Sequence, residues 1–98
     1  MNTKEELVNE RTELLHFLKT KFALIHNSNI FFRDFHFGLM EYLKEKKGKK
    51  VHYLDGETLA HEVCEEFEKL GIFCKIDHQS WRLNYPEFAL PRIEKKAS

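Results

Sequence analysis

Over the first quarter of the chain, apolar side chains recur three, four or seven residues apart, which is the spacing of one face of an α-helix. The helix is predicted to begin at Thr3, because Thr3 and Glu6 have the spacing of a capping box. It is expected to cover residues 4–26, a length of about 34 Å at a rise of about 1.5 Å per residue. Its buried face consists of Leu7, Leu14, Leu15, Leu18, Phe22 and Ile25.

Two further apolar residues lie beside that face. Phe17 and Leu24 are seven residues apart, which places them on one neighbouring face of the same helix. A helix of this length with a second apolar face exceeds what a domain of this size needs. We therefore expect Phe17 and Leu24 to form a homodimer interface.

A short polar break at residues 26–29 separates this helix from a second one over about residues 30–47. Apolar residues cover most of its circumference, which predicts a central buried helix that ends at Gly48. Phe31 and Phe32 also fit the end of a strand, so the start of this helix is left open. After it, Val51 to Leu54 alternate as a short strand would.

A third helix is predicted from Asp55, its cap, to Gly71, its C-terminal glycine. Ile72, Cys74 and Ile76 then alternate with polar residues, as do Trp81, Leu83 and Tyr85 after a polar loop at residues 77–80. This pattern predicts a hairpin whose inward side chains include Trp81. Residues 91–98 are expected to form a frayed tail.

These elements predict a mainly α fold with a small β-hairpin, an α+β class of winged-helix-like type. The chain has 98 residues and 42% hydrophobic content, which suits one compact domain. Within it we expect a long N-terminal helix in residues 1–28, a helix-helix-hairpin core in residues 29–90 and a tail in residues 91–98.

The segment Met40-Glu41-Tyr42-Leu43 is similar to the hydrophobic-acidic-aromatic-Leu motif of the DEP family of winged helices. The run Lys69-Leu70-Gly71-Ile72, the hairpin and the closing aromatics Tyr85 and Phe88 extend the resemblance over residues 30–90. Tyr42 stands where that family has Trp, and the long first helix has no counterpart there. The resemblance implies docking to membrane surfaces or partner proteins, without catalysis.

The charges are balanced overall but unevenly placed. Sixteen basic and sixteen acidic residues give a net charge of zero, so no global field attracts nucleic acid or an anionic membrane. The third helix is acidic, which disfavours the usual docking of a winged helix through its third helix into the major groove. Its charged residues are Asp55, Glu57, Glu62, Glu65, Glu66 and Glu68, against Lys69 alone.

We therefore expect a small protein-interaction or adaptor module that forms a homodimer. The alternative is a DNA-binding transcriptional regulator that contacts nucleic acid through the turn over residues 44–50 and through the hairpin. In either case the partner would be bound by one set of residues: Lys44, Lys46, Lys47, Lys49, Lys50, Lys75, His78 and Arg82.

No catalytic motif is recognisable in the chain, so we expect no enzyme activity, no cofactor and no metal. His61 and Glu65 have the spacing of two ligands on one helical face, but a zinc-protease helix has a second His at that point. Cys64 and Cys74 are expected to be buried free thiols. The N-terminus lacks a signal peptide and no apolar run would span a bilayer, which predicts a cytoplasmic protein.

Overall fold

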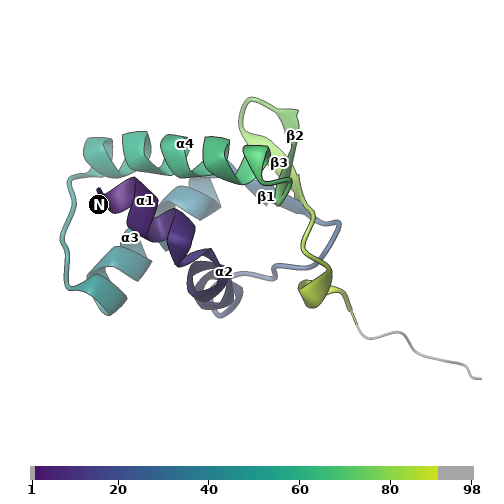
Figure 1. Cartoon of the computed structure of the whole chain (residues 1–98), viewed down its shortest axis with the longest axis horizontal. Coiled ribbons are helices and arrows are strands. Elements are labelled where there is room, and N and C mark those ends of the chain that lie inside the picture. The colour runs from purple at the N-terminus through teal and green to yellow at the C-terminus, as the bar shows by residue number, and fades with distance from the viewer. Residues whose placement is uncertain (1, 91–98) are drawn as a thin grey trace, which may run out of the picture.

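The computed structural model describes residues 2–90, which form an α+β structure of four α-helices and one small antiparallel sheet (Figure 1). The predicted tail, residues 91–98, lies outside the described residues. In chain order the elements are α1 (Thr3–Asn9), α2 (Arg11–Lys19), β1 (Asn29–Phe31), α3 (Phe32–Lys47), α4 (Tyr53–Lys69), β2 (Phe73–Asp77), β3 (Ser80–Leu83) and the short 3-10 helix η1 (Pro86–Phe88).

The prediction of one helix over residues 4–26 is wrong, because the helix breaks at Glu10. Glu10 has φ −96° and ψ 23°, outside helical values, and lies between α1 and α2. Its N–H still donates to Glu6 O at 2.9 Å and its carbonyl still accepts from Leu14 N at 2.9 Å. The break turns the chain so that α1 packs on α4 while α2 packs on α3 (Figure 1).

The second apolar face of the predicted long helix belongs to the core of the chain itself. α2 ends at Lys19, where the Thr20 hydroxyl donates to Phe17 O at 2.6 Å, and Lys19 Nζ donates to Leu24 O at 3.0 Å. The exposed fractions of Phe17 and Leu24 are only 8% and 3%. Neither side chain offers a surface to a second copy, so their assignment to a dimer interface is corrected.

Two helical glycines permit close contacts between helices. A Cβ added to Gly38 on α3 would overlap Leu18 Cδ2 of α2. One added to Gly56 on α4 would lie 3.0 Å from Met40 Sδ of α3. α3 therefore approaches a neighbouring helix closely on both of its sides, which agrees with its predicted central place.

The sheet has the order β1-β3-β2, and both pairs are antiparallel. β1 ends at Phe31, directly before α3. Of the two alternatives left open for Phe31, the end of a strand is therefore confirmed. The strand expected at residues 51–54 is wrong, because α4 already begins at Tyr53. The free side of β3 is occupied by β1, with Ile30 opposite Trp81.

The inward residues of the hairpin were predicted only in part. Trp81 and Leu83 are buried as expected. On β2, however, Phe73 is buried at 2% exposure whereas Ile76 is 53% exposed. The register of β2 is irregular between Lys75 and Asp77, so the alternation expected from Ile72 onward does not continue to Ile76.

Aromatic rings join the sheet to the helices. Phe35 of α3, Phe67 of α4 and Phe73 of β2 make three edge-to-face contacts, with ring centroids 5.2–6.1 Å apart. Trp81 Nε1 donates to Glu68 Oε2 of α4 at 2.6 Å. The sheet is thus fixed against the C-terminal half of α4.

Candidate functional site

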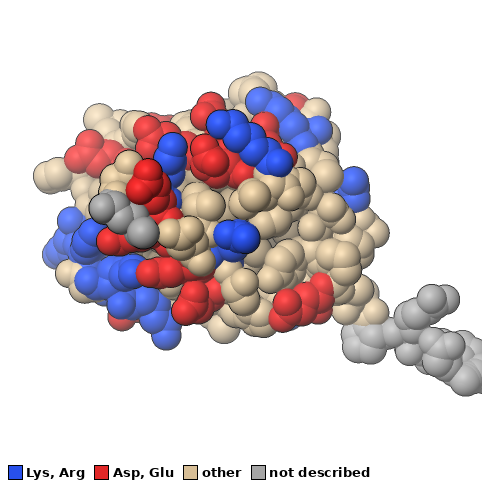
Figure 2. All heavy atoms as spheres, viewed as in Figure 1, with Lys and Arg blue, Asp and Glu red and all other residues tan. Residues whose placement is uncertain are grey.

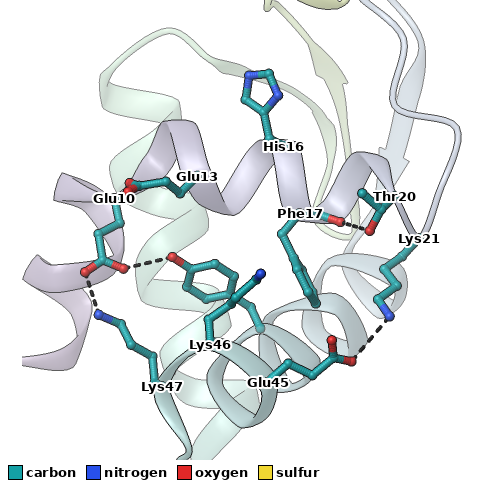
Figure 3. Close-up of a pocket in the computed structure, with 10 residues that line it drawn as sticks. Glu10, Glu13, His16, Phe17, Thr20, Lys21, Glu45, Lys46 and Lys47 are labelled. Carbon is teal, nitrogen blue, oxygen red and sulfur yellow. Dashed lines mark hydrogen bonds and ion pairs between the residues drawn. The ribbon is translucent and has the colours of Figure 1, made fainter.

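An open groove of about 730 Å³ lies between α2 and α3 (Figure 3). It brings together residues that the sequence singled out for different reasons: Phe17, Lys46 and Lys47, with Tyr42 of the DEP-like motif. Glu10, Glu13, His16, Thr20, Lys21 and Glu45 complete the lining.

One end of this groove is closed by three hydrogen-bonded side chains. Glu10 accepts from Tyr42 Oη at 2.8 Å and from Lys47 Nζ at 2.5 Å. The bonds from Lys47 and Tyr42 lower the pKa of Glu10, and the bond to Glu10 raises the pKa of Lys47. Burial, followed by the bond to Glu10, raises the pKa of Tyr42.

All three pKa values move away from neutrality, whereas a general acid or base works best with a pKa near the working pH. The cluster is therefore suited to joining the α1–α2 break to α3 and unsuited to proton transfer. None of the three residues could have been paired from the sequence, because Glu10 lies more than thirty positions from its partners.

The other end of the groove is also internally paired. Lys21 Nζ is 3.4 Å from Glu45 Oε2 and 5.2 Å from the centre of the Phe17 ring. Lys46 Nζ is 5.9 Å from the same ring. The lysines of the groove already interact with carboxylates and with an aromatic ring of this chain. The groove is therefore better described as a contact between two helices than as a binding site for an anion.

The basic turn is only partly a free surface. Lys46 and Lys47 line the groove, and Lys47 is half-buried there, whereas Lys44, Lys46, Lys49 and Lys50 are exposed. In Figure 2, Lys and Arg side chains gather at the end of the molecule where α3 stops and the chain turns towards α4.

The candidate residues of the hairpin lie elsewhere. Lys75 and His78 are exposed, and Arg82 Nη1 donates to Asn27 Oδ1 at 2.6 Å. The turn precedes α4 and the hairpin follows it, and α4, with its 17 residues, is about 26 Å long. The eight predicted binding residues therefore do not form one surface (Figure 1).

Between the turn and the hairpin lies the exposed face of α4. At its start, Tyr53 and Leu54 are 64% and 71% exposed, which is unusual for large apolar side chains. The sequence pattern missed both residues, because their alternation suggested a strand. Thr58, His61, Glu62 and Glu65 are also exposed farther along α4, and Leu54, Thr58, His61 and Glu65 recur at the three- and four-residue spacing of one helical face.

Two of the acidic residues of α4 have partners within the chain. Glu66 is 3.7 Å from Lys4 Nζ and 3.4 Å from Lys69 Nζ. Glu68 accepts from Trp81, as described above. The acidity available to a partner comes mainly from Asp55, Glu62 and Glu65, which are exposed.

A stack of rings fills the contact between α3 and α4 beneath this face. His61 lies on Phe32 with centroids 4.0 Å apart and planes at 15°. His36 contacts Phe32 and Tyr53 at 5.7 and 4.6 Å. Its Nε2 is buried without a hydrogen-bond partner in the part of the chain that is described, so ring packing holds it in place.

Metal and thiol chemistry find no support among residues 2–90. They contain no group of three or more His, Cys, Asp or Glu side chains placed to hold a metal ion. Cys64 is buried, and burial raises its pKa, so it is a poor nucleophile. Cys74, expected to be buried, is half-buried, and both thiols are free.

Comparisons with models of known protein families, with curated proteins and with solved structures found no match for this chain. Within residues 2–90, no helix combines the length and the apolar character needed to cross a membrane.

Proposed function

We propose that this chain is a non-enzymatic, winged-helix-like module that binds another protein through the exposed face of α4. The topology supports the winged-helix type. β1 lies between α2 and α3 and pairs with β3, and α4 leads directly into the β2–β3 hairpin. In a winged helix, α4 would be the recognition helix and the hairpin would be the wing.

The observation that carries the proposal is the composition of the exposed face of α4. Tyr53 and Leu54 expose apolar surface, and its removal from water in a complex would favour binding. The carboxylates of Asp55, Glu62 and Glu65 would repel phosphates but favour a cationic protein surface. A recognition helix with this composition suits a protein partner better than DNA.

Photo-crosslinking tests where the partner binds. A photoreactive amino acid at Thr58, in the middle of the exposed face, is expected to capture a protein in native lysate. The same amino acid at Thr12, exposed on α2, serves as the control and is expected to capture much less. Equal capture from both positions would contradict the proposal.

Once the captured protein is purified, its affinity for variants gives the second part of the test. Leu54→Asp and Glu62→Lys are each expected to weaken binding by about tenfold or more, which corresponds to about 1.4 kcal/mol. Thr12→Lys should leave the affinity unchanged.

The alternative, a DNA-binding regulator, is tested separately with a fluorescent 25-base-pair duplex at low ionic strength. We expect no binding. Binding that falls steeply with added salt and is lost in Lys49→Ala/Lys50→Ala would replace the protein-binding proposal with the DNA-binding one.

A further inference from the structure

We propose that His36 makes the first turn of α4, residues 53–56, sensitive to pH, so that proton uptake by this side chain releases the turn from α3. The turn carries Tyr53 and Leu54, whose exposed side chains belong to the proposed binding surface. The inference therefore rests on the proposed function as far as it concerns the regulation of binding.

The imidazole of His36 is enclosed where α3 meets the start of α4. The residue is only 4% exposed, and its Nε2 has no hydrogen-bond partner within residues 2–90. The ring centroid of Tyr53 lies 4.6 Å from that of His36, and a Cβ added to Gly56 would lie 3.3 Å from Nε2. Both contacts come from the first turn of α4, so this turn covers the imidazole.

A neutral imidazole suits this position, whereas a charged one does not. Burial disfavours the charged form of a histidine, because the ion loses its hydration. The first turn also carries the positive end of the α4 dipole, which disfavours a nearby cation. Among the described residues, the cap residue His52 makes no side-chain hydrogen bond to the N–H groups of this turn, so no cap offsets that positive end.

The surroundings of His36 supply no counter-ion to its buried nitrogen. Phe32 contacts the imidazole at 5.7 Å and is itself stacked on His61. No carboxylate in the part of the chain that the structure describes accepts a hydrogen bond from Nε2. Besides Tyr53, the titratable and charged groups on the two helices around this contact are Arg33, Asp34, Glu41, Asp55, Glu57 and His61.

The direction of the pH effect follows from proton binding. With the first turn open, the imidazole is exposed to water and takes up a proton with a midpoint at about pH 6.5, as a free histidine does. With the turn closed it stays neutral, so the open form binds more protons and is favoured as the pH falls. From about pH 7.5 to about pH 5.5, the opening equilibrium should rise about tenfold.

The first turn can open while the rest of α4 stays in place. A helix end separates at a much lower free energy than the core of a domain. The remainder of α4 is held by Ala60, Val63 and Phe67, which are fully buried in the core. Acid would therefore displace Tyr53 and Leu54 without unfolding the chain.

Amide hydrogen exchange, followed residue by residue by NMR, measures this opening. Protection factors are compared, because they remove the effect of pH on the exchange of a free peptide. In the wild type, the amide of Gly56, which donates to His52 O at 2.8 Å, should lose about tenfold in protection between about pH 7.5 and about pH 5.5. The amide of Phe67, near the far end of α4, should change much less.

Two variants remove the titrating group: His36→Leu is apolar, and His36→Gln is neutral and polar. In both, the protection of Gly56 should be independent of pH over this range. The fluorescence of Trp81, the one tryptophan of the sequence, confirms that each variant is folded, and either folded variant is sufficient for the test.

Two further histidines provide matched controls. His52→Gln removes an exposed histidine beside the same turn. His26→Gln removes a ring whose Nδ1 accepts a hydrogen bond from Tyr85 N–H at 3.0 Å, a bond that protonation would also break. Both variants should keep the tenfold loss of protection at Gly56.

Constant protection of Gly56 in the wild type, or a loss that persists in the His36 variants, would overturn the inference. A loss that His26→Gln abolishes would overturn it as well. If the loss depends on His36 but Thr58 captures no protein, the proposed function is rejected and the pH-sensitive turn stands.

Where a protein is captured, its affinity gives the last measurement. Affinity follows the fraction of the chain in the binding-competent form. The affinity of the wild type should therefore fall more between about pH 7.5 and about pH 5.5 than that of His36→Gln. Equal falls in the two chains would contradict a role of the turn in regulating binding.

Discussion

At the scale of single residues, Glu10 decides the course of the N-terminal third of the chain. It lies at the break between α1 and α2, and its carboxylate is bonded to Tyr42 and Lys47 of α3. The bonds hold the redirected chain against α3. The continuous helix was predicted from the spacing of the apolar residues, and a glutamate at this position, with its good helix propensity, gives no sign of a break.

Replacing this carboxylate is expected to change the pH dependence of stability. The folded-state pKa of Glu10 is lowered, so its contribution is fully present above the unfolded-state pKa of about 4.3. It is lost as pH falls through the folded-state pKa. Glu10→Gln should therefore lower the melting temperature at pH 7, and the difference from wild type should shrink as the pH falls below about 4.3.

Glu13→Gln is the matched control for melting curves across this range. Glu13 lines the same groove but is exposed, so its replacement should leave the curves close to wild type at every pH. A pH-independent loss in Glu10→Gln would show that the carboxylate charge is unimportant to the contact.

Other positions were predictable because the residue types found there are the ones that tolerate a positive φ angle. Gly48 and Gly71 have φ of 65° and 79°, values that favour glycine, and both end helices as expected. Asn27, with φ 72°, falls in the predicted polar break; Asn adopts such angles more readily than most residues.

At the scale of elements, the order helix, helix and hairpin from residue 32 onward follows the sequence periodicity closely. The first strand does not. Residues 51–54 alternate as a strand would, but a strand also needs a partner edge, and the open edge of β3 is taken by β1. Three residues, Asn29–Phe31, are too few to show a period, so β1 was visible only as an uncertain helix start.

The contact between the sheet and α4 is expected to depend on the hydrogen bond from Trp81 to Glu68. Glu68→Ala leaves the indole N–H, part of a side chain that is 2% exposed, without an acceptor, which should cost about 1–3 kcal/mol of unfolding free energy. Urea unfolding followed by Trp81 fluorescence measures this loss.

In Glu68→Gln the amide oxygen can still accept the bond, so this variant should lose clearly less stability than Glu68→Ala. Equal losses in the two variants would indicate that the side chain acts through packing alone.

At the scale of the whole molecule, the core extends to residues that the sequence assigned to an interface. Leu24→Ala is expected to lower the unfolding free energy by about 2–5 kcal/mol, as for other buried leucines. That is a large share of the roughly 5–15 kcal/mol typical of a domain. Leu90→Ala, the same change at a side chain that is 65% exposed, should have little effect in the same urea titration.

If Leu24→Ala instead kept full stability but changed the mass in solution, Leu24 would belong to an interface after all.

The candidate surface was harder to predict than the core for a physical reason. Which residues share a surface depends on the direction of their side chains, and closeness in sequence does not determine it. Lys47 and Lys49 are near in sequence, but Lys47 lines the α2–α3 groove whereas Lys49 is exposed to solvent.

The pairing of β1 with β3 also bears on how the chain folds as it is synthesised. Ile30 and Trp81 face each other across the sheet although about fifty residues separate them. Because synthesis proceeds from the N-terminus, all four helices emerge before β1 has a strand to pair with. Closure of the sheet over Phe35 and Phe67 is thus expected to be the late and slow step, as is usual for contacts between distant segments.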